Sequence, residues 1–343
     1  MLKRSKSSVA QSAFVAFALL GAITVAPALA QKPFHVEKRW SVGGEGGWDY
    51  LTVDANAHRL YLAHSTKVDV IDQGTGKILG AVTGLHGCHG VVISPDGKTG
   101  FISDGGANAV VVFDPSTFAT VGKIDAGKNP DGIVLEPVTN TLWALNGGSS
   151  NATVIDVATR KAVGTVTLPG RPEFPQADGK GTLFINLEDK NSIARVDAKT
   201  QKVTATWPLP GCESPSGLAM DTAGSRLFSV CDGKKMAVTD ARTGKQLALV
   251  AIGDGPDAAG YDAKNKLAFS SNGDGTLTIV DAGKAGFPVL QTVTTQKGAR
   301  TMAFDPSTET IYLPTAQFGK LEPGARRPPI VVNTLTILVV GRE

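Results

Sequence analysis

The sequence contains few of the residues that mark helical, haem-bearing or disulfide-rich proteins. Its 343 residues include 3 cysteines, and aromatic residues make up 6%. Three cysteines are too few to staple a small domain, and the absence of a Cys-x-x-Cys-His motif excludes c-type haem attachment. After the first thirty residues, no apolar stretch keeps a 3.6-residue period over three turns. Together with 40 glycines, which suit many tight turns, these absences favour an all-β protein.

Residues 1–30 have the pattern of a cleaved signal peptide. Lys3, Arg4 and Lys6 are followed by an apolar run over residues 9–25 and by Ala-Leu-Ala at residues 28–30, a signal-peptidase pattern. A membrane anchor is the alternative, although polar interruptions of the run and the cleavage pattern argue against it. We therefore expect a periplasmic or secreted protein that begins at residue 31.

The remaining chain lacks a basic excess. The leader holds three of the 34 basic residues and none of the 31 acidic ones, which leaves 31 of each sign. A nucleic-acid partner is therefore not expected, because such partners require neutralisation of phosphates. No later run is long and apolar enough to span a bilayer. The expected partner is a small molecule or a periplasmic protein, and the oligomeric state stays open.

A repeat with a period in the low forties dominates the chain. Each unit alternates short apolar strands with polar turns, and its third strand ends in aspartate. These aspartates are Asp72, Asp114, Asp156, Asp197, Asp240 and Asp281. About four strands per unit at this period is typical of a β-propeller. We predict one seven-bladed domain over residues 31–343, with four antiparallel strands per blade.

The last repeat predicts how the ring closes. After residues 334–340 the chain ends without a fourth strand, whereas residues 35–42 form an orphan strand at the other end. Pairing the two would complete blade 7 and remove an open sheet edge. The loop at residues 316–332 within this blade is either a surface loop or a flap over the channel mouth.

The first residues of the inner strands should form a ring at one channel mouth. Alignment of the repeats places there a set rich in carboxylates. The set is Asp49, His89, Asp131, Glu173, Ser216, Asp257 and Arg300. Clustered carboxylates raise one another's pKa values or hold a cation. A solvated polar mouth and a small-molecule or metal site both remain open.

A second ring is expected outside the first, where the second strands end. Its members are His64, Asp104, Asn146, Leu187, Cys231, Ser271 and Thr315. In blades 1 and 2 the two rings together predict a transition-metal site of His64, His89, Asp49 and Asp104. His86 and Cys88 lie in the intervening loop. Imidazole and carboxylate suit zinc, copper or nickel.

The three cysteines are sorted by their positions in the repeats. Cys212 precedes the inner strand of blade 5 and Cys231 ends its second strand, so both should lie on the mouth face. We predict a Cys212–Cys231 disulfide and a free thiol at Cys88.

The strands resemble the YncE-like, YVTN-type seven-bladed propellers of exported bacterial proteins. The resemblance is carried by second strands such as Leu60-Tyr61-Leu62-Ala63-His64 and Leu142-Trp143-Ala144-Leu145-Asn146, and by Pro130-Asp131-Gly132 and Pro256-Asp257-Ala258 before inner strands. It implies the propeller fold and a periplasmic location. It supplies no catalytic residue, because no motif of the lactone-hydrolysing propellers is present.

These observations predict a non-catalytic protein that binds a ligand or partner through its channel-mouth face. The alternative is a lactonase-like hydrolase or a lyase at the same mouth. In that reading His89, Glu173 and Arg300 are the candidate catalytic residues, with His89 as base and Arg300 stabilising negative charge.

Overall fold

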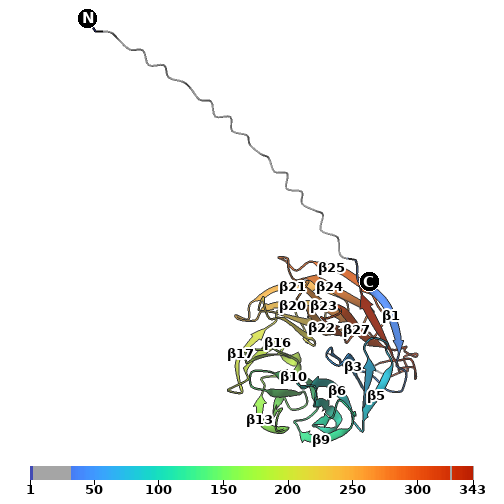
Figure 1. Ribbon diagram of the computed structural model, residues 1–343. Coiled ribbons are helices and arrows are strands. Elements are labelled where there is room, and N and C mark those ends of the chain that lie inside the picture. Colours follow the sequence, from blue (N-terminus) through green and yellow to red (C-terminus); the bar gives the residue numbers. More distant parts are fainter. Residues whose placement is uncertain (3–31, 325–326, 343) are drawn as a thin grey trace. The chain divides into compact units, whose positions relative to one another are not determined.

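The computed structural model describes residues 1–2, 32–324 and 327–342. The predicted signal peptide lies outside the described residues, apart from its first two. Residues 33–343 form one compact unit, in which seven four-stranded antiparallel sheets are arranged as a ring (Figure 1). The predicted seven-bladed propeller is confirmed.

The first four blades follow one another along the chain, each from its innermost to its outermost strand. Blade 1 contains β2 (Leu51–Asp54), β3 (Arg59–His64), β4 (Lys67–Asp72) and β5 (Ile78–Thr83). Blade 2 contains β6 (Cys88–Ile93), β7 (Gly100–Asp104), β8 (Ala109–Phe113) and β9 (Thr120–Asp125). Blade 3 contains β10 (Pro130–Glu136), β11 (Thr141–Asn146), β12 (Asn151–Asp156) and β13 (Lys161–Thr167). Blade 4 contains β14 (Pro172–Ala177), β15 (Thr182–Leu187), β16 (Ser192–Asp197) and β17 (Lys202–Pro208).

The last three blades complete the ring. Blade 5 contains β18 (Leu218–Asp221), β19 (Arg226–Cys231), β20 (Lys235–Asp240) and β21 (Gln246–Ala251). Blade 6 contains β22 (Pro256–Asp262), β23 (Leu267–Asn272), β24 (Thr276–Asp281) and β25 (Val289–Thr294). Blade 7 contains β26 (Ala303–Asp305), β27 (Thr310–Thr315), β28 (Thr336–Gly341) and β1 (His35–Ser41). Two short 3₁₀ helices, η1 (Gly105–Ala107) and η2 (Glu188–Lys190), follow second strands. Among the described residues, no helix has the length and apolar character needed to cross a bilayer.

The closure of blade 7 is also confirmed. Strand β1 pairs antiparallel with β28 from His35 opposite Gly341 to Ser41 opposite Thr336. Trp40 of β1 stacks on Tyr312 of β27, with ring centroids 5.7 Å apart. The first and last strands of the propeller are therefore held in one sheet (Figure 1).

The aspartates that reveal the period in the sequence form the turns after the third strands. One carboxylate oxygen of Asp72 accepts hydrogen bonds from the Thr75 backbone N–H at 2.8 Å and from its hydroxyl at 2.6 Å. These bonds stabilise the ionised carboxylate and lower the pKa of Asp72. The same pair of bonds recurs between Asp156 and Thr159. The repeat signal is thus a turn motif that ends one strand and starts the next.

The core is divided among the junctions between blades. The described residues form seven apolar clusters, and each draws on two adjacent blades. At the first junction, Tyr61 of blade 1 and Phe113 of blade 2 are fully buried, with ring centroids 5.8 Å apart. Each blade therefore buries both faces only because it has two neighbours, so stability depends on the closed ring.

Candidate functional site

Irregularities in the inner strands aim polar side chains at the channel mouth. In four blades the pairing between first and second strands shifts directly after the first strand residue, so that two residues oppose one. These β-bulges contain His89, Asp131, Glu173 and Asp257. A bulge redirects a side chain that regular pairing would place on a sheet face. The ring predicted from the sequence therefore has a backbone cause.

The inner strands also approach one another closely at this level. A Cβ added to Gly132, next to Asp131, would lie 2.3 Å from the backbone oxygen of Glu173 in the next blade. Only glycine fits at this contact without moving one of the strands. The close approach brings ring residues of neighbouring blades within reach of each other.

Six of the seven predicted ring residues line one cavity of about 840 Å³. They are Asp49, Asp131, Glu173, Ser216, Asp257 and Arg300. The seventh, His89, contacts two of them. The structure thus brings the predicted ring together, and we call this cavity the cup.

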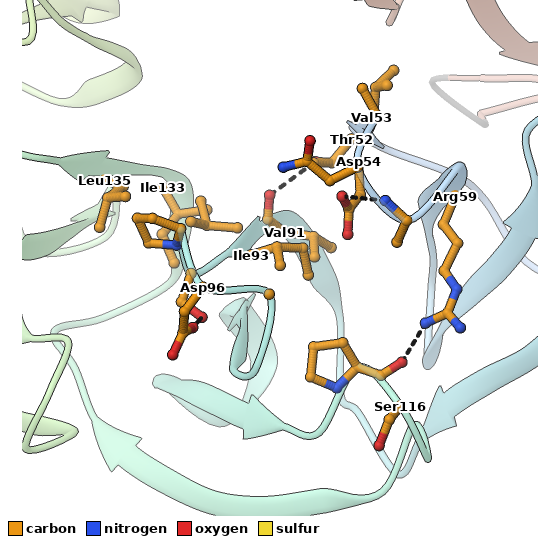
Figure 2. A pocket seen from close by; sticks show the side chains of 18 of the residues that line it. Thr52, Val53, Asp54, Arg59, Val91, Ile93, Asp96, Ser116, Ile133 and Leu135 are labelled. Carbon is orange, nitrogen blue, oxygen red and sulfur yellow. Dashed lines mark hydrogen bonds between the residues drawn. The ribbon is translucent and has the colours of Figure 1, made fainter.

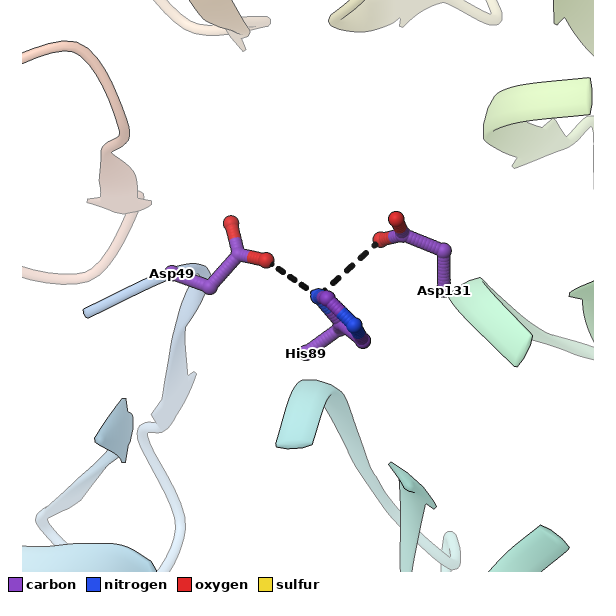
Figure 3. A group of neighbouring side chains, drawn as sticks. All are labelled: Asp49, His89 and Asp131. Carbon is purple, nitrogen blue, oxygen red and sulfur yellow. Dashed lines mark hydrogen bonds and ion pairs between the residues drawn. The ribbon is translucent and has the colours of Figure 1, made fainter. Parts of the chain in front are cut away.

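His89 lies between two carboxylates from the flanking blades. Its Nδ1 donates a hydrogen bond to Asp49 Oδ2 at 2.5 Å and lies 3.7 Å from Asp131 Oδ1 (Figure 3). Burial alone would lower the pKa of His89, but the bond to Asp49 and the charge of Asp131 raise it to about 9. The imidazole is therefore a cation at neutral pH.

The surroundings of Asp131 disfavour its ionised form. Burial raises its pKa to about 7, and the charge of His89 offsets only part of this effect. Its Oδ1 is shielded from solvent and accepts no hydrogen bond. Asp131 therefore has an acceptor atom that no protein donor satisfies.

On the other side of the cup, Arg300 forms an ion pair with Asp257. Burial raises the pKa of Asp257 to about 6, although Arg300 opposes the shift. Both partners come from ring positions of adjacent blades. This pair is satisfied within the protein.

Blade 4 contributes a third group. Glu173 lies 3.9 Å from Arg171, whereas Arg171 makes its closer contact, 3.0 Å, with Glu188 of η2. Burial and the charge of Asp131 raise the pKa of Glu173 to about 8. At neutral pH this carboxyl group holds its proton for most of the time.

Two aromatic side chains close the channel beneath the ring. Tyr50 of blade 1 and Phe174 of blade 4 have ring centroids 5.0 Å apart. Because these blades are not neighbours, the rings meet across the channel. Burial, together with the charge of Asp257, raises the pKa of Tyr50 well above its usual value. The cup therefore has an apolar, uncharged floor.

The residues that follow the ring positions in the sequence indicate which side chains form this floor. The residue after each ring position is small in most blades. The set is Tyr50, Gly90, Gly132, Phe174, Gly217, Ala258 and Thr301. Tyr50 and Phe174 are the two exceptions, and they are the pair that meets across the channel. Arg171 and Glu188 were also missed, because their contact depends on where η2 lies.

The loop at residues 316–332 borders the cup. Phe318, Arg327 and Ile330 line the cavity, and Phe318 and Trp48 have ring centroids 6.1 Å apart. A bridge pairs Phe318 with Ile330 across the base of the loop. Of the two alternatives left open, a loop at the mouth agrees with this position.

The predicted second ring does not join the first. The Nδ1 of His64 bonds to Asp69 at 2.7 Å in a buried pair, and Asp104 accepts a hydrogen bond from the His86 backbone N–H at 2.8 Å. Only the side chains of Asp49, His89 and Asp131 gather as candidate metal ligands among the described residues. The structure therefore does not bring His64 and Asp104 together with His89 and Asp49, the other two members of the predicted set. A second-strand end lies against its own hairpin partner, whereas the bulge points inward.

The structure also corrects the predicted places of two other residues, Ser271 and Cys88. The residue opposite Pro256 at the end of the second strand of blade 6 is Asn272, so the assignment of Ser271 was shifted by one. Cys88 Sγ donates to the Lys67 carbonyl at 3.0 Å, and burial raises the pKa of this thiol to about 12. Cys88 is therefore an inert buried thiol and no ligand in the cup.

The cysteines are paired as the sequence predicts. Cys212 and Cys231 form a disulfide with Cα atoms 5.3 Å apart, and Cys88 is free and buried. The bridge fixes the segment that leads to Ser216 against the second strand of the same blade.

A second cavity, of about 720 Å³, lies at the other ends of the inner strands of blades 1 to 3 (Figure 2). Val53, Ile93 and Leu135 line it, and Thr52 donates a hydrogen bond to the Val91 carbonyl at 2.8 Å across the blade junction. It lacks the clustered charges of the cup.

Comparison with known proteins supports the fold. No protein-family description and no curated protein matches the chain. Among solved structures, hydrazine synthase of Kuenenia stuttgartiensis is similar with a TM-score of 0.68 and 18% identity, over 78% of this chain and 92% of that one. The WD40 repeats of RRP9 are similar with a TM-score of 0.74 and 13% identity, over 92% of this chain and 99% of that one. A chain of the mitotic checkpoint complex is similar with a TM-score of 0.71 and 15% identity, over 88% of this chain and 95% of that one. At these identities the likeness shows the propeller fold alone.

Proposed function

We propose that this protein is an exported, YncE-like propeller that acts without catalysis and binds a small amine-bearing ligand in the cup. The propeller fold itself suggests a scaffold for binding a partner. The resemblance in the strand motifs and the leader pattern support the family and the location.

The observation that carries the proposal is the unequal pairing of charges in the cup. Arg300 is engaged by Asp257 and Arg171 by Glu188. Asp131 and Glu173 come from adjacent blades. Among the described residues, the nearest cation to Asp131 is the His89 imidazole at 3.7 Å and the nearest to Glu173 is Arg171 at 3.9 Å, and both distances exceed that of a hydrogen bond. An ammonium group placed between them would favour the ionised form of both carboxyl groups and pair with it, and the aromatic rings of Tyr50 and Phe174 suit such a cation.

The same geometry argues against the hydrolase or lyase alternative. Because the pKa of His89 is raised to about 9, its imidazole is mostly protonated at neutral pH and is poorly suited to act as a general base. Arg300 is held by Asp257, whose carboxylate already neutralises its charge. Glu173 could serve only as an acid, and no nucleophile contacts it among the described side chains.

The test uses three molecules with the same four-carbon chain. Putrescine carries two ammonium groups, succinate two carboxylates and 1,4-butanediol two hydroxyls. We expect only putrescine to raise the melting temperature of the purified protein in a saturable way, because it adds a cation where carboxylates lack one.

The matched variant is Glu173→Gln, which keeps the shape of the side chain but cannot ionise when an ammonium group binds beside it. It should lose most of the putrescine response. An equal response in the variant, or equal responses to all three molecules, would contradict the proposal.

A further inference from the structure

A triad at one edge of the cup has the composition of a metal site. Asp49, His89 and Asp131 come from three successive blades, and one ligand atom from each lies within 4.8 Å of the others. The three side chains are only 20%, 24% and 16% exposed. They point toward a common centre in the channel mouth (Figure 3).

We infer that Asp49, His89 and Asp131 bind one divalent transition-metal ion, with zinc as the reference ion. The imidazole is what separates this triad from an ordinary acidic cluster. It selects first-row transition metals over magnesium and calcium, which prefer oxygen ligands alone. The inference is independent of the amine ligand proposed above, because the ion alone is its probe.

The hydrogen-bond pattern supplies a second, separate observation. Asp131 Oδ1 is shielded from solvent and accepts no hydrogen bond, with His89 Nδ1 at 3.7 Å as its nearest cationic partner. The proton on Nδ1 lies between Asp49 Oδ2 and this oxygen. An ion in the same position would contact Nδ1 and both oxygens at about 2.0–2.2 Å after small side-chain movements. Binding therefore exchanges one proton, released to solvent, for the ion.

Ser103 holds two of the ligand-bearing strands in register. Its hydroxyl donates to the Asp131 carbonyl at 2.5 Å and accepts from the Gly90 backbone N–H at 2.8 Å. One side chain thus connects the bulge of His89 with that of Asp131. Ser103 touches no ligand atom, so it is a positioning residue.

Asp49 is fixed in a comparable way from both sides. Its backbone N–H donates to the Ala63 carbonyl at 3.0 Å, and its carbonyl accepts from the Thr301 hydroxyl at 3.0 Å. On the other flank, a Cβ at Gly105 would lie 2.7 Å from His89 Nε2. The glycine leaves room for the imidazole.

Three protein ligands leave a fourth coordination position. Because the triad borders the cup, that position opens toward the cavity. Such an arrangement is typical of exchangeable rather than structural ions. A bound ion would give the cup a Lewis-acidic edge opposite the Arg300–Asp257 pair.

The experiment is calorimetric titration of the untagged, EDTA-treated protein with zinc, with magnesium as the negative control. Wild type should bind one zinc ion and no magnesium in the same concentration range. His89→Gln and Asp131→Asn should each remove zinc binding, and circular dichroism checks that both variants fold. His86→Ala, which alters an exposed imidazole outside the triad, should bind as wild type does.

Ser103 is tested against its counterpart in blade 6. Ser271 donates to the Arg300 carbonyl at 2.5 Å and makes the same cross-blade bond far from the triad. Ser103→Ala should weaken zinc binding about tenfold or more, the usual effect of losing a residue that orients ligands, whereas Ser271→Ala should not. Absence of zinc binding in wild type, or undiminished binding in His89→Gln and Asp131→Asn, would overturn the inference. Putrescine binding that survives those results would leave the amine proposal standing.

Discussion

The two sides of the cup hold positive charge in different ways at equivalent ring positions. Next to Asp257 the cation is Arg300, and between Asp49 and Asp131 it is His89. A guanidinium cannot lose its proton in a protein and has no lone pair for a metal, so that pair is fixed. An imidazole can exchange its proton for an ion. One backbone position therefore serves either as a structural ion pair or as a binding site, according to a single side chain.

One contact between blades is the same on both sides of the cup. Ser103 bonds to the carbonyl of Asp131, and Ser271 bonds to the carbonyl of Arg300, each at 2.5 Å. The inner strands differ, because His89 and Asp131 lie in β-bulges, whereas Arg300 precedes the regular pairing of β26. Four sets of substitutions can break or sharpen the contrast between the two sides.

We expect the largest effect when the disulfide of blade 5 is removed. Replacing both Cys212 and Cys231 by alanine should lower the free energy of unfolding by about 3 kcal/mol, because the bridge closes a loop between residues 19 apart. Urea denaturation monitored by circular dichroism measures the change. Cys88→Ala, which removes a buried thiol without a bridge, should cost about 1 kcal/mol. Equal losses in the two proteins would show that the disulfide adds no stability. Thiol counting on the denatured, unreduced wild type should give one free thiol.

The fixed ion pair should be next in importance. Arg300→Met leaves Asp257 in a largely buried position without its cation, which should cost about 2–3 kcal/mol. His89→Gln should cost less, because the amide still offers an N–H to Asp49. Combining Arg300→Met with Asp257→Asn should restore part of the loss. If His89→Gln proves the more destabilising change, the assignment of fixed and exchangeable cations is reversed.

Glu173 should control part of the pH dependence of stability. Its pKa is raised to about 8 in the folded protein, compared with about 4.3 in an unfolded chain. Between these values the folded state binds the extra proton, so stability falls as the pH rises from about 5 to 8. Glu173→Gln mimics the protonated acid and should be more stable than wild type at pH 8.5, by about 1–2 kcal/mol, with little difference at pH 5. Urea denaturation at both values is the measurement, and Glu322→Gln in the exposed part of the loop is the control. Parallel pH profiles for wild type and Glu173→Gln would contradict the assignment.

The smallest effect compares the two serines directly. Ser103→Ala and Ser271→Ala should each lower the free energy of unfolding by about 1 kcal/mol, since each removes a cross-blade hydrogen bond. Thermal and urea denaturation of both variants should therefore agree, although only Ser103→Ala alters zinc binding. Unequal losses in the free energy of unfolding would mean that the serine hydrogen bond does not contribute equally on the two sides of the cup.

The sequence was informative wherever a local motif repeats. The aspartates of the third strands are visible because five of the six build the same turn with a following threonine or serine, as Asp72 does with Thr75. The sixth, Asp281, accepts a hydrogen bond from the Gly283 backbone N–H instead. The ring was predictable for the same reason, since its members occupy equivalent positions before or within the inner strands. The closure by β1 followed from counting strands at the two ends.

The contacts between rings were not predictable, because they depend on the direction of side chains rather than on their position in the repeat. His64 and Asp104 lie at the same end of their blades as His89, but His64 bonds to Asp69 within its own hairpin. Asp131 lies beside His89 because a bulge turns it inward. The sequence does not mark such bulges consistently, since a glycine follows two of the four bulge residues, His89 and Asp131, but not the other two. The Tyr50–Phe174 contact depends on the width of the closed channel, which no single repeat encodes.

The pairing of β1 with β28 has a consequence for the order in which the protein is made. Synthesis produces β1 before every other strand of the propeller and its partner β28 after all of them, so β1 has no strand to pair with until β28 has been made. This contact spans nearly the whole sequence, and such long-range pairing is slow to form. A product that stops before β28 leaves β1 and β27 without the strand that lies between them, so blade 7 stays incomplete. The closed ring therefore forms only in chains that include β28.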